Sequence, residues 1–305
     1  MADKRLIDDI LKLKKEKNAV ILAHNYQIPE VQDIADYTGD SLGLSRQAAQ
    51  AEAEVIVFCG VKFMAESAKI LSPEKTVLIP EPQSLCPMAA MIEPLALKKK
   101  KEEYPRAVVV TYVNSTAAVK AESDVCCTSS NALQIVEAIS GEQILFVPDQ
   151  NLGNYVAGRT EKEIITWDGY CSTHHRVQPE EIEKVKAKHP ETPILVHPEC
   201  VSGVVDKADY VGSTAGILEY ARNSSSEKLI IGTEQGLLHR LKKENPHKDF
   251  FVLSPSLICP NMKKINLEKI QSSLKEMNTQ IEIPEKTRKK AKQALDKMLE
   301  FTANG

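Results

Sequence analysis

The chain has 305 residues, of which 42% are hydrophobic and 27% are charged, and its formal net charge is −3. This length is enough for two or three structural units with buried cores, and the slightly acidic balance argues against a nucleic-acid or membrane-surface protein. No apolar run approaches the roughly 18 residues that span a bilayer, and the opening residues are charged and amphipathic, without the apolar core of a signal peptide. We therefore expect a cytoplasmic protein with no nucleic-acid partner and no membrane partner.

Short apolar runs alternate with amphipathic helical patterns along the whole chain. The first third predicts strands at 19–23, 36–38, 55–59 and 76–79, with helices at 41–53 and 62–71. Further helices are predicted at 4–17, 93–104 and 179–189, and two more in the tail at 266–276 and 285–302. Strands that alternate with helices through short connections indicate parallel sheets covered by helices, which is an α/β architecture.

One pattern recurs three times. The segments 19–26, 107–114 and 192–199 are similar apolar runs that end in polar residues, with offsets of 88 residues (24 to 112) and 85 residues (112 to 197). The same offsets relate two other sets of positions: Asp36, Asp124, Asp209; and Phe58, Phe146, Ile231. A repeat fixes the architecture, so we predict three pseudo-symmetric α/β/α sandwich domains around a common centre. Their predicted extents are 1–85, with the tail 263–305 packed on it, then 86–170, and then 171–262.

Three of the seven cysteines follow the repeat. Cys86, Cys171 and Cys259 lie 62, 59 and 62 residues after the histidine or tyrosine that ends the first strand of each unit (24 to 86, 112 to 171, 197 to 259). An odd number of cysteines without a secretory signal makes disulfides a poor explanation. If the three units meet around an axis, the three thiolates converge. Three thiolates without a fourth suit an iron–sulfur cluster with one open, Lewis-acidic iron.

The other four cysteines have simpler interpretations. Core packing explains Cys59, Cys126 and Cys127 better than ligation does. Cys200 adjoins the predicted site but has no cysteine in register with it. It also follows Glu199, and successive residues of a strand point to opposite sides, so we expect it not to bind the metal.

Polar side chains end the first strand of each unit. Ligands of open parallel sheets bind beyond the carboxyl ends of the strands, and those ends carry His24, Tyr26, Tyr112, Asn114, His197 and Glu199. Ser41, Ser129 and Thr214 lie in register where helices are expected to begin; such residues cap helices, and helix N-termini also attract anions. His174, three residues after Cys171, is expected beside the cluster, whereas His189, His239 and His247 are expected on the surface. Together these positions favour a small substrate with several negative charges.

Several long motifs carry a resemblance to a known family. "LAHNYQIPEVQDIADYTGDSL", "PDQNLGNYV", "GYCSTHH", "HPECVSGVVDKADYVGSTAG", "IGTEQGLLHRL" and "CPNMKKINLE" resemble the quinolinate synthase family, and the likeness extends over essentially the whole chain. The resemblance implies three α/β/α domains around a [4Fe–4S] cluster held by three cysteines. It also implies an enzyme of NAD biosynthesis that condenses iminoaspartate with dihydroxyacetone phosphate to quinolinate, releasing phosphate and water. An L-aspartate oxidase or dehydrogenase would supply the iminoaspartate.

The resemblance also implies roles for individual residues. The cluster ligands would be Cys86, Cys171 and Cys259; Tyr26 and Glu199 would move protons. Substrate contacts, including the catalytic His24 and Tyr112, would come from His24, Tyr112, Asn114, His174 and His197. Carboxylates or phosphate would be held by Ser41, Ser129, Ser213 and Thr214, and Met262 would line the pocket. The family's occasional C-x-x-C-x-x-C run is absent, since this chain has only "CPNMKK", which removes a possible redox disulfide but no cluster ligand.

Two other classes of protein remain open at this point. A zinc-dependent hydrolase or isomerase could use three cysteines, although three thiolates make a soft site that is less suited to activating water. A non-catalytic α/β binding protein would show repeated sheets but would need neither the three registered cysteines nor the ring of His24, Tyr26 and Glu199.

Overall fold

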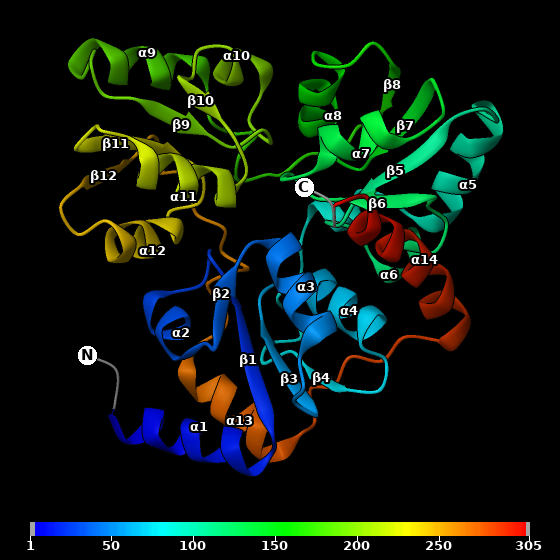
Figure 1. Ribbon diagram of the computed structural model, residues 1–305, viewed down its shortest axis with the longest axis vertical. Helices are drawn as coiled ribbons and strands as arrows, with labels where there is room; N and C mark the ends of the chain where they lie inside the picture. Colours follow the sequence, from blue (N-terminus) through cyan, green and yellow to red (C-terminus); the bar gives the residue numbers. More distant parts are fainter. Residues whose placement is uncertain (1–3, 303–305) are drawn as a thin grey trace.

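Three separate parallel sheets form the framework of the molecule. The structure is a computed structural model that describes residues 4–302. Each sheet has four strands, in the orders β2-β1-β3-β4, β6-β5-β7-β8 and β10-β9-β11-β12, and each lies in a lobe of its own flanked by helices (Figure 1). We call these lobes units 1, 2 and 3. The predicted α/β class with three pseudo-symmetric sandwiches is therefore confirmed.

Strands and helices alternate in every unit. Unit 1 contains α1 (Lys4–Glu16), β1 (Ala19–His24), α2 (Pro29–Ile34), β2 (Tyr37–Gly39), α3 (Ser41–Gln50), β3 (Val55–Cys59), α4 (Lys62–Leu71) and β4 (Thr76–Leu78). Unit 2 contains the 3-10 turn η1 (Met88–Ala90), α5 (Pro94–Glu103), β5 (Val108–Tyr112), α6 (Ala117–Lys120), β6 (Val125–Cys127), α7 (Ala132–Ala138), β7 (Gln143–Val147), α8 (Gln150–Ala157) and β8 (Glu163–Thr166).

Unit 3 has the same order, and the tail adds two helices. Unit 3 contains α9 (Pro179–Lys188), β9 (Ile194–Val196), α10 (Ser202–Val205), β10 (Tyr210–Val211), α11 (Thr214–Asn223), β11 (Lys228–Gly232), α12 (Leu237–Glu244) and β12 (Asp249–Val252). The tail forms α13 (Leu267–Glu276) and α14 (Glu285–Phe301). The short helices α2, α6 and α10 were not indicated by the sequence patterns, because one turn or two cannot show a helical period, yet their first residues follow the repeat.

The strand pairings keep the register of the repeat. In the three units the first and second strands pair through Leu22↔Tyr37, Val110↔Val125 and Leu195↔Tyr210. The aspartates Asp36, Asp124 and Asp209 each accept a backbone N–H from the first strand at 2.8 Å. The offsets of 88 residues (22 to 110) and 85 residues (110 to 195) therefore describe one three-dimensional unit used three times.

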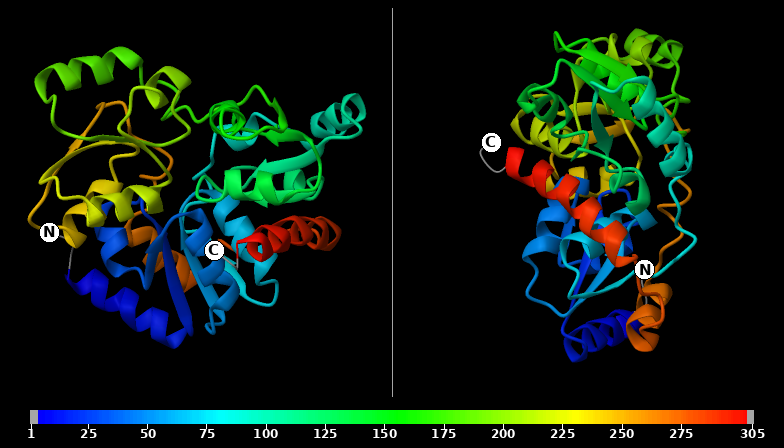
Figure 2. Two further views of the ribbon diagram at one scale, coloured as in Figure 1. Left: turned by 45° about the horizontal axis from the view of Figure 1, so that its top comes forward. Right: turned by 90° about the vertical axis from the view of Figure 1, so that its right-hand side faces the viewer.

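The tail joins the units from outside. Helix α13 packs beside α1 under unit 1 (Figure 1), and the segment after it pairs with the edge of β4 through Leu78 and Gln280. Helix α14 packs against α4 of unit 1 and against α6 and β6 of unit 2, lying across both (Figure 2). The domain boundaries predicted at residues 85, 170 and 262 remain predictions, and the outer limits 1 and 305 lie outside the described residues.

The hydrophobic core connects the units. The largest cluster of buried side chains includes Phe58 of β3, Phe146 of β7 and Ile231 of β11, one from each unit. Smaller clusters lie between unit 1 and α13, within unit 2 and within unit 3. Within residues 4–302, no helix combines the length and the apolar character needed to cross a bilayer. The continuous core holds the three units in one arrangement, with their strand ends facing one another.

Candidate active site between the three units

A cavity lies where the three units meet. It encloses about 650 Å³, including its opening to solvent. Of the fifteen residues assigned to the site from the sequence, all but Ser213 line it; the lining members are His24, Tyr26, Ser41, Cys86, Tyr112, Asn114, Ser129, Cys171, His174, His197, Glu199, Thr214, Cys259 and Met262. Residues far apart in the chain therefore converge as the repeat predicted. Their chemical roles are a separate question.

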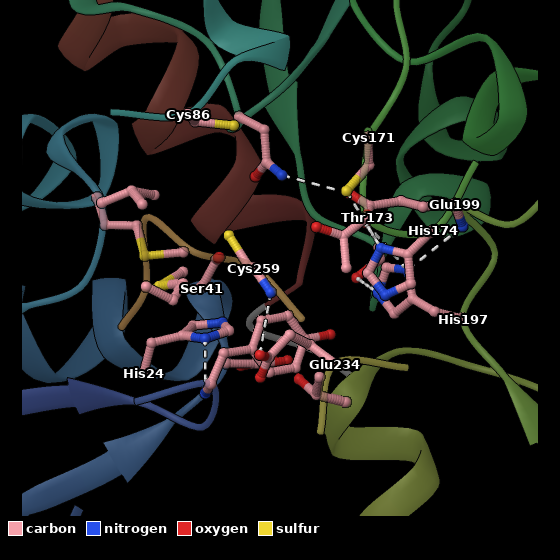
Figure 3. Close-up of a pocket in the computed structure, with 18 of the residues that line it drawn as sticks. His24, Ser41, Cys86, Cys171, Thr173, His174, His197, Glu199, Glu234 and Cys259 are labelled. Atoms are coloured by element: carbon pink, nitrogen blue, oxygen red, sulfur yellow. Dashed lines mark hydrogen bonds and ion pairs between the residues drawn. The ribbon is translucent and has the colours of Figure 1, made fainter. Parts of the chain in front are cut away.

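The three cysteines enter the cavity from three different loops. Cys86 follows β4, Cys171 follows β8 and Cys259 follows β12. All three are free thiols, and their sulfur atoms surround one space (Figure 3). Burial raises the pKa of Cys86 to about 12 and also raises the pKa values of Cys171 and Cys259. Without a bound cation the thiols are thus protonated, and a metal would have to displace their protons.

The spacing of the sulfur atoms limits which metal group the cysteines can hold. Thiolates on one tetrahedral zinc ion lie about 3.8 Å apart, given a Zn–S bond of about 2.3 Å. In the described part of the chain, the group of three ligand atoms within 4.8 Å of one another consists of Cys171, His174 and Glu199, not of the three cysteines. Three soft donors set wider than a single ion requires fit a larger iron–sulfur group better than a zinc ion.

Glu199 is the centre of the polar network. Its Oε2 atom lies 2.7 Å from Nδ1 of His174, and its Oε1 atom accepts a hydrogen bond from Asn114 at 3.3 Å. The Tyr112 hydroxyl is hydrogen-bonded to the same carboxylate. Burial acts to raise the pKa of Glu199, but the imidazoles of His197 and His174 and these hydrogen bonds outweigh it and lower the pKa. The carboxylate is therefore held in its charged form.

A threonine that the sequence analysis missed connects two of the predicted residues. The hydroxyl of Thr233 lies 2.6 Å from the hydroxyl of Tyr26 and 2.9 Å from Nε2 of His174. Because His174 contacts Glu199 through its other nitrogen, a continuous chain of polar atoms runs from Tyr26 to Glu199. Thr233 is the first residue after β11; that place at a strand end was the available signal, but its register partners Gly60 and Pro148 carry no hydroxyl.

The two strand-end histidines share one arrangement. Nδ1 of His24 accepts the backbone N–H of Tyr26 at 3.2 Å, and Nδ1 of His197 accepts that of Glu199 at 3.3 Å. Burial lowers the pKa of each histidine to about 3, so both rings are neutral. With Nδ1 as the acceptor, the proton lies on Nε2, and Nε2 of His197 is 3.2 Å from the Ser129 hydroxyl in the cavity.

Two of the three predicted helix starts are confirmed and one is wrong. Ser41 is the first residue of α3, behind the capping residue Asp40, and Thr214 is the first residue of α11, capped by Ser213. Ser129 does not begin a helix: the Asn131 side chain accepts the N–H of Thr128 at 2.6 Å, which closes a turn, and α7 begins only at Ala132.

The cavity receives positive potential from its helix ends. Among the described residues that line it, none is lysine or arginine, whereas Glu199 and Glu234 are both present. The N-termini of α3 and α11 direct their partial positive charge toward the cavity residues Ser41 and Thr214. An anionic ligand would therefore depend on helix ends, hydroxyls and a bound metal for its attraction.

The remaining cysteines and histidines lie outside the cavity lining. Cys59, Cys126, Cys127 and Cys200 are each at most 1% exposed and belong to hydrophobic clusters, as the sequence analysis expected. His189 and His247 are exposed, and His239 is half-buried and bonds Asp33 at 3.0 Å. Besides Thr233, the sequence analysis did not single out Asp40, Thr128, Thr173 or Glu234, the last four of which line the cavity.

Comparison with known proteins agrees with this geometry. The family model described as "Quinolinate synthetase A protein" matches residues 8–300. The chain belongs to the quinolinate synthase family. It is 56% identical over 302 residues to the quinolinate synthase of Alkaliphilus metalliredigens (strain QYMF), covering 99% of this chain and 100% of that protein. It is 52% identical over 299 residues to the quinolinate synthase of Methanosarcina barkeri (strain Fusaro / DSM 804), and 53% over 299 residues to that of Geobacter sp. (strain M21), in both cases over 98% of each chain.

Membership of the quinolinate synthase family extends to the peripheral helices. The matched residues run from α1 into α14, so the match includes all three sheets, the three cysteine loops and the tail that joins units 1 and 2. The cavity is therefore part of the region that the quinolinate synthase family shares with this chain.

Proposed function

We propose that the chain is a quinolinate synthase that condenses iminoaspartate with dihydroxyacetone phosphate to quinolinate, with loss of phosphate and water. The observation that carries the proposal is the meeting of three cysteines, one from each unit, on the cavity that also holds Glu199 and Tyr26. Family membership supports the activity. The zinc-hydrolase alternative is disfavoured by the spacing of the three sulfur atoms and the non-catalytic alternative by the buried acid–base network.

Cys86, Cys171 and Cys259 would hold a [4Fe–4S] cluster. When bound, such a cluster with only three protein ligands supplies an open iron that acts as a Lewis acid toward a hydroxyl or carbonyl oxygen. The cysteines fit this role because they are soft donors, partly buried and wider apart than one ion requires. Cys200 is buried in the core of unit 3 and leaves the fourth position free.

The helix ends would bind the negative charges of the substrates. Ser41 at the start of α3 and Thr214 at the start of α11 face the cavity, and Ser129 adds a hydroxyl next to His197. Ser213 would act indirectly, because its hydroxyl accepts the N–H of Gly216 at 3.2 Å and so fixes the helix end. Two carboxylates and one phosphate would thus be held without a lysine or arginine in the lining.

Glu199 and Tyr26 would move the protons. A low pKa keeps Glu199 anionic and able to accept a proton, while burial raises the pKa of Tyr26 and keeps its hydroxyl available as a donor. The Thr233 hydroxyl and His174 connect the two groups. Tyr112 and Asn114 orient the Glu199 carboxylate through hydrogen bonds.

The neutral histidines would bind the substrate as hydrogen-bond donors. His24 and His197 present Nε2–H because Nδ1 of each ring is occupied by a backbone N–H. Met262, buried beside them, would contribute an apolar wall. An enzyme that oxidises L-aspartate, either an oxidase or a dehydrogenase, would supply iminoaspartate, and the cytoplasmic location remains a prediction from the composition.

Anaerobic purification followed by an activity assay tests the proposal. We expect a brown protein that contains iron and sulfide and forms quinolinate from the two substrates. A colourless protein that contains zinc would support the hydrolase or isomerase instead, and a protein without metal would support a binding function. Iron and sulfide without quinolinate formation would refute the assigned reaction while leaving the cluster in place.

A further inference from the structure

Three register-equivalent residues lie directly behind the cysteine loops. Val61, Asp149 and Glu234 are related by the offsets of the repeat (61 to 149 and 149 to 234), and each is the second residue after the third strand of its unit, β3, β7 or β11. All three are buried: Val61 is 3% exposed, and Asp149 and Glu234 are 0% exposed. Two of the three are therefore buried carboxyl groups, and buried carboxyl groups require partners.

The partners of Glu234 include a cysteine loop. Oε1 of Glu234 accepts the backbone N–H of Cys259 at 3.1 Å, and Oε2 accepts that of Gly236 at 2.7 Å. Lys263 completes the arrangement, with its ammonium group 2.9 Å from Oε1 and hydrogen-bonded to the carbonyl of Tyr26. Glu234 thus ties the Cys259 loop to the start of α12 and, through Lys263, to unit 1.

Gly236 makes room for this arrangement. A Cβ atom at this position would lie 2.8 Å from Oε2 of Glu234, from Nζ of Lys263 and from the carbonyl carbon of Tyr26. Contacts that short do not occur between real atoms, so the close approach of the three groups depends on the glycine.

Asp149 occupies the same place in unit 2. Its Oδ1 atom accepts the N–H of Leu152 at 2.9 Å and caps α8. Burial and then the charge of Glu199 raise the pKa of Asp149, while the backbone N–H of Cys171 is among the groups that lower it. Oδ2 makes no hydrogen bond of normal geometry within the described residues, so a buried acceptor lies beside the second cysteine loop.

Unit 1 solves the same problem without a carboxylate. Val61 offers no acceptor, and Ser84 is used instead. The carbonyl of Ser84 accepts the N–H of Lys62 at 2.8 Å. Its hydroxyl lies 3.0 Å from the carbonyl of Gly60 and 2.8 Å from that of Asn261, which joins the Cys86 loop to the Cys259 loop.

We propose that Glu234 and Asp149 are positioning residues for the cluster ligands of units 3 and 2, acting on the backbone N–H groups of Cys259 and Cys171. A fixed amide restricts the backbone of the cysteine and so directs its sulfur atom into the cavity, as groups behind metal ligands generally do. Ser84 has this task in unit 1. The inference rests on the proposed function, because it takes Cys259 and Cys171 as ligands of a cluster.

Iron release from the anaerobic holoprotein tests the proposal. Glu234→Ala should lose iron to a ferrous chelator roughly 10- to 100-fold faster than the wild type, the usual penalty for removing a group that orients a metal ligand. Glu234→Gln, which keeps an acceptor but removes the ion pair with Lys263, should be intermediate and tests the proposal if the alanine variant does not fold. The matched control is Asp209→Asn, a carboxylate of the same unit that accepts one backbone N–H, from Ile194, away from the cavity; it should release iron at the wild-type rate.

A second measurement does not depend on the cluster. In cluster-free protein, amide hydrogen exchange at Cys259 should be faster in Glu234→Ala than in the wild type and unchanged in Asp209→Asn. Unchanged exchange in Glu234→Ala, or equal acceleration of iron release by Asp209→Asn, would overturn the positioning role. A wild-type protein that binds no iron would overturn the proposed cluster and the ligand-positioning role together, and the exchange data would then show whether the Glu234–Cys259 bond exists independently.

Discussion

The two ends of the repeated sheets have been treated differently. Away from the cavity, Asp36, Asp124 and Asp209 make the same contact in all three units, a 2.8 Å hydrogen bond from the first strand. At the cavity, equivalent positions carry different chemistry: tyrosine at 26, asparagine at 114 and glutamate at 199. The comparison teaches that the framework depends on what the units share, and that the proposed reaction depends on where they differ.

The largest effect should come from the cysteines, the cavity-end feature that all three units share. Replacing Cys86, Cys171 or Cys259 with alanine should abolish both the cluster and quinolinate formation, because each removes one of only three ligands. Iron and sulfide analysis after anaerobic reconstitution measures this, with Cys200→Ser as the control that should retain a normal cluster. Normal iron and sulfide in any one of the three alanine variants would show that the cysteines do not act as a set.

The next largest effect should come from the residues that differ at one register position. Glu199→Gln and Tyr26→Phe should keep the cluster but lower kcat by about 10²- to 10⁴-fold, since each removes a proton carrier and no ligand. The measurement is quinolinate formation normalised to iron content. Near wild-type turnover in both variants would contradict their acid–base roles.

Thr233 tests whether the polar chain between units matters. Thr233→Val should lower kcat by about tenfold, the effect of losing one hydroxyl from a buried hydrogen-bond chain, and should shift the pH profile of kcat. Thr111→Val is the matched control, because Thr111 is equally buried and bonds the Ser123 hydroxyl at 2.6 Å outside the cavity lining. An unchanged pH profile in Thr233→Val, or the same loss of kcat in the control, would assign Thr233 a structural role only.

The buried histidines at the cavity end should make the fold sensitive to acid. The pKa values of His24 and His197 are about 3 in the folded protein, below the value of about 6.5 expected in the unfolded chain. Between these values the unfolded state binds more protons, so the free energy of unfolding falls as the pH falls from 6.5 toward 3. At pH 5 the loss should be about 2 kcal/mol per histidine.

Chemical denaturation of the cluster-free protein at pH 7 and pH 5 measures this loss. His197→Gln should show a shallower dependence than the wild type, because one of the two groups no longer titrates. Identical pH dependence in the two proteins would contradict the buried, neutral state of His197.

The smallest effects should come from the shared framework contact. Asp36→Asn, Asp124→Asn and Asp209→Asn should each lower the free energy of unfolding by about 1 kcal/mol, because the amide keeps an acceptor but loses the charge. Thermal denaturation should give three similar shifts, and kcat per cluster should not change. A loss of kcat in any one of them would show that framework and site are less separate than the comparison holds.

Much of the site could be predicted because the repeat carries its own register. Once His24, Tyr112 and His197 were aligned, the same offsets placed the aspartates, the third strands and the cysteine loops, and the observed pairings of Leu22, Val110 and Leu195 agree. The exception was Ser129, where a local turn closed by Asn131 delays the start of α7. Such a turn depends on side-chain geometry that strand and helix periodicity do not report.

The sequence by itself determined the alternation of strands and helices, the threefold repeat and the three matching cysteines, because these follow from local periodicity and spacing along the chain. Only the tertiary structure decided which groups meet across units. The Tyr26 hydroxyl meets Thr233, 207 positions away, Lys263 joins Glu234 to the carbonyl of Tyr26, and α14 lies across units 1 and 2. The physical reason is that such contacts are set by how the buried faces of three separately formed sheets pack together, and no pattern within a single unit encodes that packing.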